Sequence, residues 1–513
     1  MNTKHLIAAL ALGAIASPTL AADIIVPDDV PTLELALNPA VSGLAPGDTI
    51  VLRAGLYAGA FTVGVQDITI RPFGDDAVTI DSFGTGSVLT VGAMGSGLIL
   101  EDLIISGGGG VSQGGGMLID GTTVTIRRCT FRDNEVIDDG AAIRSRTSTL
   151  IIEDSLFENN TLELPNTTDD GGAILAEFDT NITITGTTFR NNHANFRGGA
   201  LAIFNDAVLT MSDCLFEMNR SFVDGGAIAF VNGGRGTISD TLFQDNIADN
   251  AGGGIYSNGS WPHFSRCTFT RNEASGNGGG AAAIQGETTE EVRFFNCLLY
   301  NNIAELNGGA LLTLTGPDPS MDSCTIVGNQ IRDTVNGNGG GIWEAGGGTA
   351  TRLSNSILRD NIPTQYPVSR TNVAFYCNVS GGELSGNLAI IDEDPMFVDA
   401  AGGNFRLMPG SPSIDAGDTR NYSDDQAPID LAGNDRCVTD PDSAGTGFPI
   451  MRLYTDHGAY EFQPTLPCTS DCVGDTTTTG ATLDGQPGFG EPDGVIDLDD
   501  LGFFLGQWLV GCP

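Results

Sequence analysis

The chain is short of positive charge. Lys4 is the only lysine among 513 residues, and Lys and Arg together number 23 against 64 Asp and Glu, which gives a formal net charge of −41. A field of that sign repels polyanions. It therefore excludes nucleic acid, anionic membrane surfaces and polyuronates as direct partners.

Long apolar runs are equally scarce. The run at 6–16 is too short to cross a bilayer, but Lys4 and His5 precede it and the small-residue cleavage pattern Thr19-Leu20-Ala21 follows it. Residues 1–21 therefore predict a signal peptide, with a buried N-terminal strand or helix as the alternative. No later segment reaches about 18 uninterrupted apolar residues. We expect an exported protein, secreted or held at the cell surface, without a membrane span.

What the chain has instead is a repeat of the form F-x-x-N followed by G-G-A-I, seen clearly at 213–228. A Cys, Ser or Thr stands two residues before each aromatic or aliphatic member, and an Asn stands three residues after it. The members are spaced 26 to 32 residues apart: Phe131, Phe157, Phe189, Phe216, Phe243, Phe269, Leu299, Ile326 and Leu358. Periods in this range indicate a solenoid.

The composition of the repeat predicts which solenoid it is. Neither the L-x-x-L-x-L pattern of leucine-rich repeats nor a helical period is present. Short alternating runs such as 124–127 and 181–185 are broken by Gly, Asn and Asp. Three strands of about five residues plus turns fill about 27 residues. We therefore predict an all-β protein, a right-handed parallel β-helix with three short strands per coil, followed by a small C-terminal calcium-loop and helix domain.

The repeated positions then have physical causes. Residues two apart on a strand share a face, so Cys214 and Phe216 are expected to point inward. Equal side chains in successive coils stack about 4.8 Å apart. The Asn at each turn tolerates the left-handed conformation and is expected to bond to its neighbours as a ladder, and Gly-Gly permits the next corner.

The GGAI and FxxN repeats over 115–361 resemble those of the polymorphic outer membrane proteins, within the wider pectin-lyase-like β-helix superfamily. Residues 23–62 resemble the N-terminal cap of that superfamily, which implies a short helix around 31–39. Residues 394–462 resemble a module that closes many bacterial β-helix surface proteins ahead of a variable anchor. The resulting domains are a signal peptide 1–21, a cap with first coils 22–110, repeats 111–393, a C-terminal cap 394–467 and a tail 468–513.

The tail carries a candidate calcium loop. Asp493, Asp497 and Asp500 fall at positions 5, 9 and 12 of such a loop, with Gly494 at the sharp turn and the Val495 carbonyl at position 7. The tail as a whole resembles a dockerin-like anchoring domain ending in Gly-Cys, which implies a cell-envelope or cohesin-like receptor. Only one of the two dockerin loops is intact, and an acidic turn without metal is the alternative. The predicted ligands are Asp475, Asp493, Val495, Asp497 and Asp500.

The ten cysteines form two groups. Five occupy the repeat column and are expected to be buried free thiols, with disulfides between neighbouring coils as the alternative. The others are interpreted as lying outside the column. Among these, Cys472 can pair with Cys512, and Cys437 with Cys377 or Cys468, in an exported protein. The column cysteines are Cys129, Cys214, Cys267, Cys297 and Cys324.

No catalytic residue is predicted. Enzymes of the superfamily use carboxylates that hold calcium beside an Arg or Lys, or paired Asp residues, but the N-T-D, G-H-G and R-I-K elements of its glycoside hydrolases are absent apart from a loose echo at 166–169. The arginines of the repeat form no evident column, and His193, His263 and His457 are scattered. Aspartates just before the glycine corner are interpreted as turn residues: Asp138, Asp139, Asp169, Asp170, Asp224 and Asp249.

Two functions remain. The first is a non-catalytic rod that binds a glycan, a matrix component or an envelope protein, and the second is an extracellular polysaccharide lyase or glycoside hydrolase. Three or more acidic and arginine side chains clustered on one strand face of adjacent coils would favour the enzyme, and an even polar surface would favour the rod. The regular ladder and the missing motifs favour the rod.

Overall fold

The computed structural model describes residues 21–163, 169–286, 290–316, 318–345, 350–366, 373–384, 387–419, 429–436, 438 and 455–464. The predicted signal peptide, except for its last residue, and the tail 468–513 lie outside this part of the chain. So do Cys437, Cys468, Cys472 and Cys512, so the pairings expected among them stay predictions.

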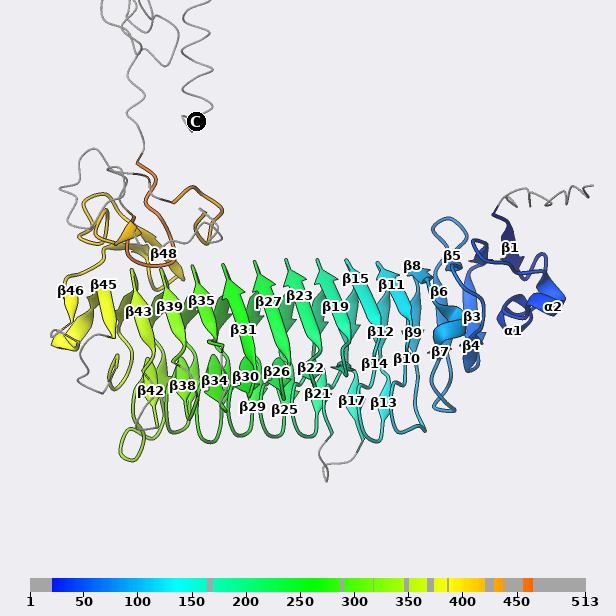
Figure 1. Cartoon of the computed structure of the whole chain (residues 1–513), viewed down its shortest axis with the longest axis horizontal. Coiled ribbons are helices and arrows are strands. Elements are labelled where there is room, and N and C mark those ends of the chain that lie inside the picture. The colour runs from blue at the N-terminus through cyan, green and yellow to red at the C-terminus, as the bar shows by residue number, and fades with distance from the viewer. Residues whose placement is uncertain are drawn as a thin grey trace, which may run out of the picture.

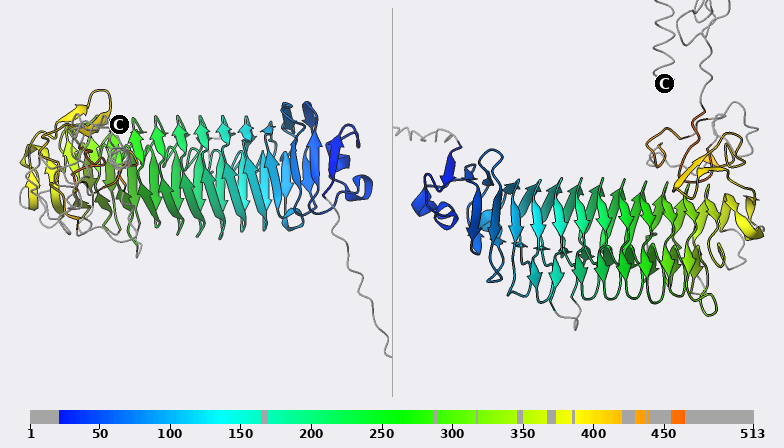
Figure 2. Two further views of the ribbon diagram at one scale, coloured as in Figure 1. Left: turned by 90° about the horizontal axis from the view of Figure 1, so that it is seen from above. Right: turned by 180° about the vertical axis from the view of Figure 1, so that it is seen from behind.

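Each coil contributes short strands to three parallel sheets. In one coil these are β14 (Ile143–Arg146), β15 (Thr149–Glu153), β16 (Leu156–Glu158) and β17 (Thr161–Leu162). β15 and β16 belong to one sheet of 27 strands (sheet A), β14 to one of 11 (sheet B) and β17 to one of eight (sheet C). The coils follow one another along the long axis, as the views from the front, above and behind show (Figures 1 and 2). The predicted solenoid is confirmed. In each coil such as this one, a bend divides the segment that belongs to sheet A into two consecutive strands.

Sheet B is the side that matters below. Every neighbouring pair in it is parallel and in register, such as Ile143 with Ile174 and Leu201 with Ile228. Its strands are β4 (Phe61–Val63), β7 (Leu89–Val91), β10 (Met117–Asp120), β14, β18 (Ile174–Glu177), β22 (Leu201–Phe204), β26 (Ile228–Val231), β30 (Ile255–Asn258), β34 (Ala282–Gln285), β38 (Leu311–Thr313) and β42 (Ile342–Glu344).

The aromatic column fills the interior as predicted. Phe131 and Phe157 are fully buried and stacked, with ring centroids 4.9 Å apart. The stack continues through four more rings with centroid separations of 4.7 to 5.1 Å. The spacing between neighbouring β-strands brings identical rings of successive coils into van der Waals contact, so phenylalanine fits this position in each of these coils. The further rings are Phe189, Phe216, Phe243 and Phe269.

The predicted asparagine ladder is present as well. Asn219 is fully buried, and its Nδ2 donates to the Phe189 carbonyl at 2.9 Å and to Asn246 Oδ1 at 3.0 Å. Its own Oδ1 accepts from the Asn192 side chain at 3.0 Å. The left-handed residue of this turn is not the ladder Asn but the residue before it, as Met218 shows with φ 55°.

The thiol column is buried and free, as expected. Cys214 Sγ donates to the Ser212 carbonyl at 3.1 Å, and burial raises the pKa of that thiol to about 12. Cys377 is likewise a free buried thiol. Because Asn378 pairs with Ile357, Cys377 falls opposite Ser356 and continues the column, contrary to its placement outside it. It is not in a disulfide with Cys437.

Other segments of the chain pack against the solenoid near both of its ends. At the N-terminal end, α1 (Leu33–Ala36) and α2 (Pro39–Ser42) lie where a short helix was expected, and Leu33 and Ala36 join the core. At the other end, the segment expected as a cap packs on the outer side of sheet A (Figure 1). There β47 (Phe397–Asp399) and β48 (Asn404–Leu407) bring Phe405 against Leu298 and Val327.

Candidate functional site: a charged corner on sheet B

A column of residues runs along the corner where each coil turns into sheet B. These residues form isolated parallel bridges with one another in most successive coils, and each stands directly before a corner glycine. Unlike the interior columns, this column changes its residue from coil to coil. In chain order it reads Gln113, Asp139, Asp170, Arg197, Asp224, Ala251, Gly278, Asn307 and Asn338. Four consecutive members, Asp139 to Asp224, carry charge, and we call this stretch the charged corner.

The glycine that follows brings the corner over the outer face of the sheet. Gly171 has φ 73°, and a Cβ there would lie 2.4 Å from the Ile174 carbonyl oxygen. Only glycine permits both the left-handed backbone and this close approach. The corner side chains therefore lie beside the outward residues of β14, β18 and β30.

The first half of the charged corner is a group of carboxylates. Asp139 accepts hydrogen bonds from Gln113 Nε2 at 3.0 Å and from the Asp170 amide at 3.1 Å. Asp169 and Asp170 are 4% and 6% exposed. Asp170 Oδ1 is buried without a hydrogen-bond partner among the described residues. A buried carboxylate oxygen without a donor is costly, and this cost favours the protonated form of Asp170.

An ion pair lies next to these carboxylates on the outer face of the sheet. The Arg144 guanidinium contacts the Glu177 carboxylate across neighbouring strands β14 and β18, with side chains 16% and 9% exposed. Arg144 Nε has no partner among the described residues. The position that Arg144 takes is occupied by Leu175 and Ala202 in the next two coils. Arg144 is therefore a local departure from an apolar column, whereas Glu177 stands in another column, opposite Arg146.

In the second half of the charged corner, an arginine and an amide both contact one carboxylate. Arg197 Nε lies 4.0 Å from Asp224 Oδ2, and Asn250 Nδ2 donates to Asp224 Oδ1 at 2.7 Å. The Tyr256 ring packs close by, and its hydroxyl donates to Gln285 Oε1 at 3.1 Å. Arg197, Asn250 and Gln285 are only partly buried, so this half presents amide and guanidinium donors to solvent.

The carboxyl groups of the charged corner titrate above their ordinary range. Burial raises the pKa of Asp139, Asp170 and Asp224, most strongly for Asp170. Arg197 opposes the rise in the pKa of Asp170, while the neighbouring charges of Asp139 and Asp169 add to it. Raised pKa values bring carboxyls toward the protonated form that donates a proton or a hydrogen bond.

The structure brings together some of the residues singled out in the sequence and separates others. Asp139, Asp169, Asp170 and Asp224 cluster, whereas Asp249 pairs with Arg220 at 2.9 Å in another part of the coil. Arg190, Arg197 and Arg220 stand in different columns, so the structure does not contradict the prediction that the arginines of the repeat form no column. The expected regularity is corrected at the corner, where Arg197 stands between two aspartates of one column. Arg144, Glu177 and Tyr256 were missed. The signal for Arg144 and Tyr256 was a large polar side chain at a strand position that is leucine or alanine in the neighbouring coils. Glu177 gave no such signal, because Arg146 takes its position in the preceding coil.

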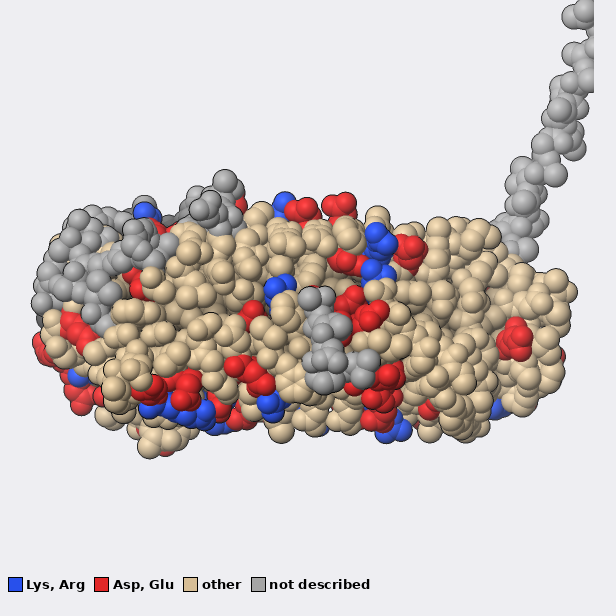
Figure 3. All heavy atoms as spheres, turned by 90° about the horizontal axis from the view of Figure 1, so that it is seen from below, with Lys and Arg blue, Asp and Glu red and all other residues tan. Residues whose placement is uncertain are grey.

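Charged side chains are grouped rather than evenly spread on the face of the molecule that Figure 3 shows. Broad uncharged areas separate the groups. Within the described residues, no set of three or more His, Cys, Asp or Glu has the arrangement of a metal site. The predicted calcium ligands Asp475, Asp493, Val495, Asp497 and Asp500 lie outside those residues.

Comparison with known proteins agrees with this architecture. The profile of the family described as "Right handed beta helix region" matches residues 56–243 and 221–387, well over half of the chain. The chain belongs to the right-handed β-helix family. A solved structure titled as that of pectate lyase Pel9A aligns over 87% of this chain and 97% of that chain, at 12% identity and a TM-score of 0.36. No curated protein matches the chain. Among the described residues, no helix has the length and apolarity needed to cross a bilayer.

Proposed function

We propose that this protein is an exported, rigid β-helix that binds a neutral polysaccharide at the charged corner of sheet B. In this proposal the tail 468–513 attaches it to a cell-envelope receptor through a calcium-binding, dockerin-like loop. The observation that carries the first part is the gathering of Arg144, Glu177, Asp170, Arg197 and Asp224 on one face of adjacent coils.

The chemistry of these groups favours a neutral glycan. Sugar hydroxyls donate to carboxylates and accept from guanidinium and amide groups, and the charged corner offers all three kinds within a few coils. Tyr256 adds a ring, although it is largely covered by its neighbours. A polyanion would meet both the local excess of carboxylates and the net charge of −41.

The binding part is tested by titrating neutral polysaccharides into the full chain. The double variant Arg144→Ala with Arg197→Ala should weaken binding about tenfold or more, because each loses charge-assisted bonds. A double variant of Arg266 and Arg271 to Ala is the matched control, since these arginines pair with Asp240 and Asp245 on the sheet A side. Equal weakening by both variants, or no binding by the wild type, would contradict the proposal.

Cleavage of the bound glycan is the second candidate. It is favoured by the clustering of acidic and arginine side chains on adjacent coils, which is the arrangement expected of an enzyme, and by the raised pKa values of Asp170 and Asp224. The two residues stand two coils apart with Arg197 between them, which separates their backbones by about 10 Å. Inverting glycosidases hold their carboxyls about 6.5–9.5 Å apart, one as acid and one as base. Release of reducing ends that is lost in Asp170→Asn but kept in Asp249→Asn would establish cleavage. Binding without release would leave the protein a binding rod.

The tail is tested by calorimetric titration of calcium into the full chain. Asp497→Ala should abolish the binding event, because calcium needs several oxygen ligands and this residue supplies one. Asp435→Ala, which changes a carboxylate of the folded part, is the control. If the wild type binds no calcium, the dockerin-like interpretation of the tail is wrong, while the proposal for the charged corner is unaffected.

A further inference from the structure

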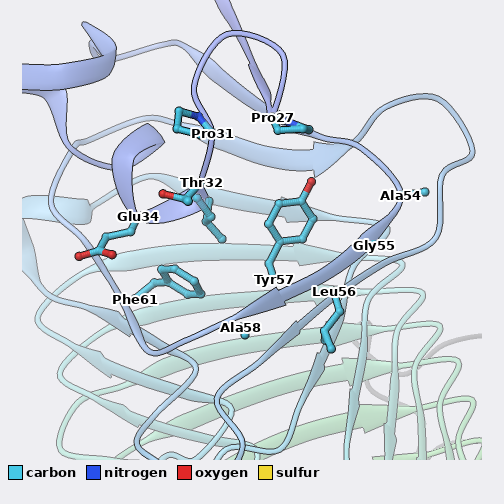
Figure 4. A pocket seen from close by; sticks show the side chains of 11 residues that line it. Pro27, Pro31, Thr32, Glu34, Ala54, Gly55, Leu56, Tyr57, Ala58 and Phe61 are labelled. Atoms are coloured by element: carbon cyan, nitrogen blue, oxygen red, sulfur yellow. The ribbon is translucent and has the colours of Figure 1, made fainter.

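A pocket of about 390 Å³ lies at the N-terminal end of the solenoid, between the cap and the first coil. The cap segment 27–34 forms one wall, and β3 (Gly55–Ala58) forms the other. The rings of Tyr57 and Phe61 extend into the space between them (Figure 4). This end of the molecule is opposite the end that carries β47 and β48 (Figure 1).

The floor of the pocket is the start of the hydrophobic core. Tyr57 pairs with Ile80 and is therefore the first member of the inward column that continues to Phe131. Phe61 pairs with Leu89 and opens the inward column of sheet B. In later coils such residues are covered by the next coil on both sides. Here one side is covered only in part, because α1 shields the core without adding a strand.

The wall formed by β3 is an open sheet edge. Its only strand partner among the described residues is β6 (Val78–Asp81). The amides of Gly55 and Gly59 donate toward that partner, to the carbonyls of Ala77 at 3.0 Å and Asp81 at 2.9 Å. Because backbone direction alternates along a strand, the N–H and C=O groups of Leu56 and Ala58 face the other edge. That edge borders the pocket, and a row of unpaired backbone groups is a template for another strand.

The charge of the pocket is of one sign. Glu34 is its only charged lining residue, and its side chain is exposed and lies at the rim (Figure 4). The carboxylate of the nearby Asp28 forms an ion pair with the guanidinium of Arg53 at 2.7 Å. Leu56 is 56% exposed at the other rim. A ligand that fills the pocket therefore meets an apolar floor, an apolar side chain and one unpaired carboxylate.

We propose that β3 accepts an added strand from another protein. The strand is an extended peptide that places an apolar side chain over Tyr57 and Phe61 and a basic side chain beside Glu34. Main-chain bonds to Leu56 and Ala58 supply affinity, and the two side chains supply specificity. A sugar or a compact small molecule would leave the linear row of backbone groups unpaired, whereas an extended peptide matches their spacing. The proposal is independent of the charged corner.

The test uses the full chain and an array of short peptides in which one Val, Leu, Ile or Phe and one Arg are moved through a Ser-Thr background. The tightest peptide is then measured by fluorescence anisotropy. Ala58→Pro should weaken its binding about tenfold, because it removes an N–H from the open edge, a position where proline is compatible with a strand. Ala58→Ser keeps the N–H and should bind as the wild type does.

Two further comparisons separate strand addition from other modes of binding. Methylation of the peptide nitrogens that would face β3 should reduce binding about tenfold, and Glu34→Gln should remove the preference for Arg over norleucine. Far-ultraviolet circular dichroism and the Tm of each variant show whether the coil remains folded. Undiminished binding of the methylated peptide, or no binding across the array, would overturn the proposal. Self-association of the chain that Ala58→Pro abolishes would also overturn it, in favour of a second copy as occupant.

Discussion

Two kinds of column run along the same coils, one inside the solenoid and one at the corner of sheet B. Inside, Asn219 donates and accepts with its neighbours in both adjacent coils, and each neighbour does the same. At the corner, Asp170 Oδ1 and Arg197 Nε are buried without hydrogen-bond partners among the described residues. A column that repeats is explained by coil geometry, which is the same in every coil. Coil geometry does not explain a column whose residue changes from coil to coil, so such a column is a candidate for a functional site.

The largest expected effect is inside the aromatic column. Phe216→Ala removes a fully buried ring stacked at 4.7 Å on Phe189 and 5.1 Å on Phe243, and should cost about 3–5 kcal/mol of unfolding free energy. Phe216→Leu should cost less than about 1.5 kcal/mol, because Leu299 fills the same column elsewhere. Urea denaturation followed by circular dichroism measures both. Equal costs for Ala and Leu would show that the stack is not what stabilises these coils.

The asparagine ladder comes next. Asn219→Ala should lower the unfolding free energy by about 2–4 kcal/mol, because it leaves the Phe189 carbonyl and the side chains of Asn192 and Asn246 short of a buried partner. Asn181→Ala, at an exposed strand position, should change it by no more than about 0.5 kcal/mol. A small effect of Asn219→Ala would mean that water enters the ladder when one rung is lost.

At the corner, the expected effects are smaller and depend on charge. Arg144→Ala leaves Glu177 nearly buried without its ion partner and should cost about 2 kcal/mol. Arg271→Ala breaks an exposed pair with Asp245, 49% and 36% exposed, and should cost less than about 0.5 kcal/mol. The same denaturation experiment decides between them. Matching values for the two variants would remove the distinction between the charged corner and an ordinary surface pair.

The smallest effect has the opposite sign. Asp170→Asn should raise the unfolding free energy at pH 7 by about 1 kcal/mol, since it removes a buried charge whose Oδ1 has no donor. The folded pKa of Asp170 is raised, so its contribution to stability is present below the unfolded pKa of about 3.9 and is lost as pH rises. The advantage of the variant should therefore vanish near pH 3. A destabilised variant at pH 7 would indicate that the carboxylate is satisfied by a group such as a bound ligand.

The interior could be predicted from the sequence because its causes are local. Alternation along a strand places Cys214 and Phe216 on one face, and the repeat of 26 to 32 residues stacks them on their equivalents. The corner column can be aligned in the sequence only on the glycine that follows each of its members, because its distance from the ladder varies. Arg197 lies five positions after the ladder Asn192, but Asp170 lies ten positions after the ladder Asn160. Counting from the ladder therefore does not show that the two corner residues are neighbours.

The sequence by itself determined the solenoid and its inward columns, because these follow from periodicity and from the need to bury the same face in every coil. Tertiary structure decided which outward residues meet. The pairing of Arg144 with Glu177, the neighbours of Asp170 and the open edge of β3 depend on strand register and on loops of unequal length. Those two features relate residues across coils, and no spacing within one coil specifies them.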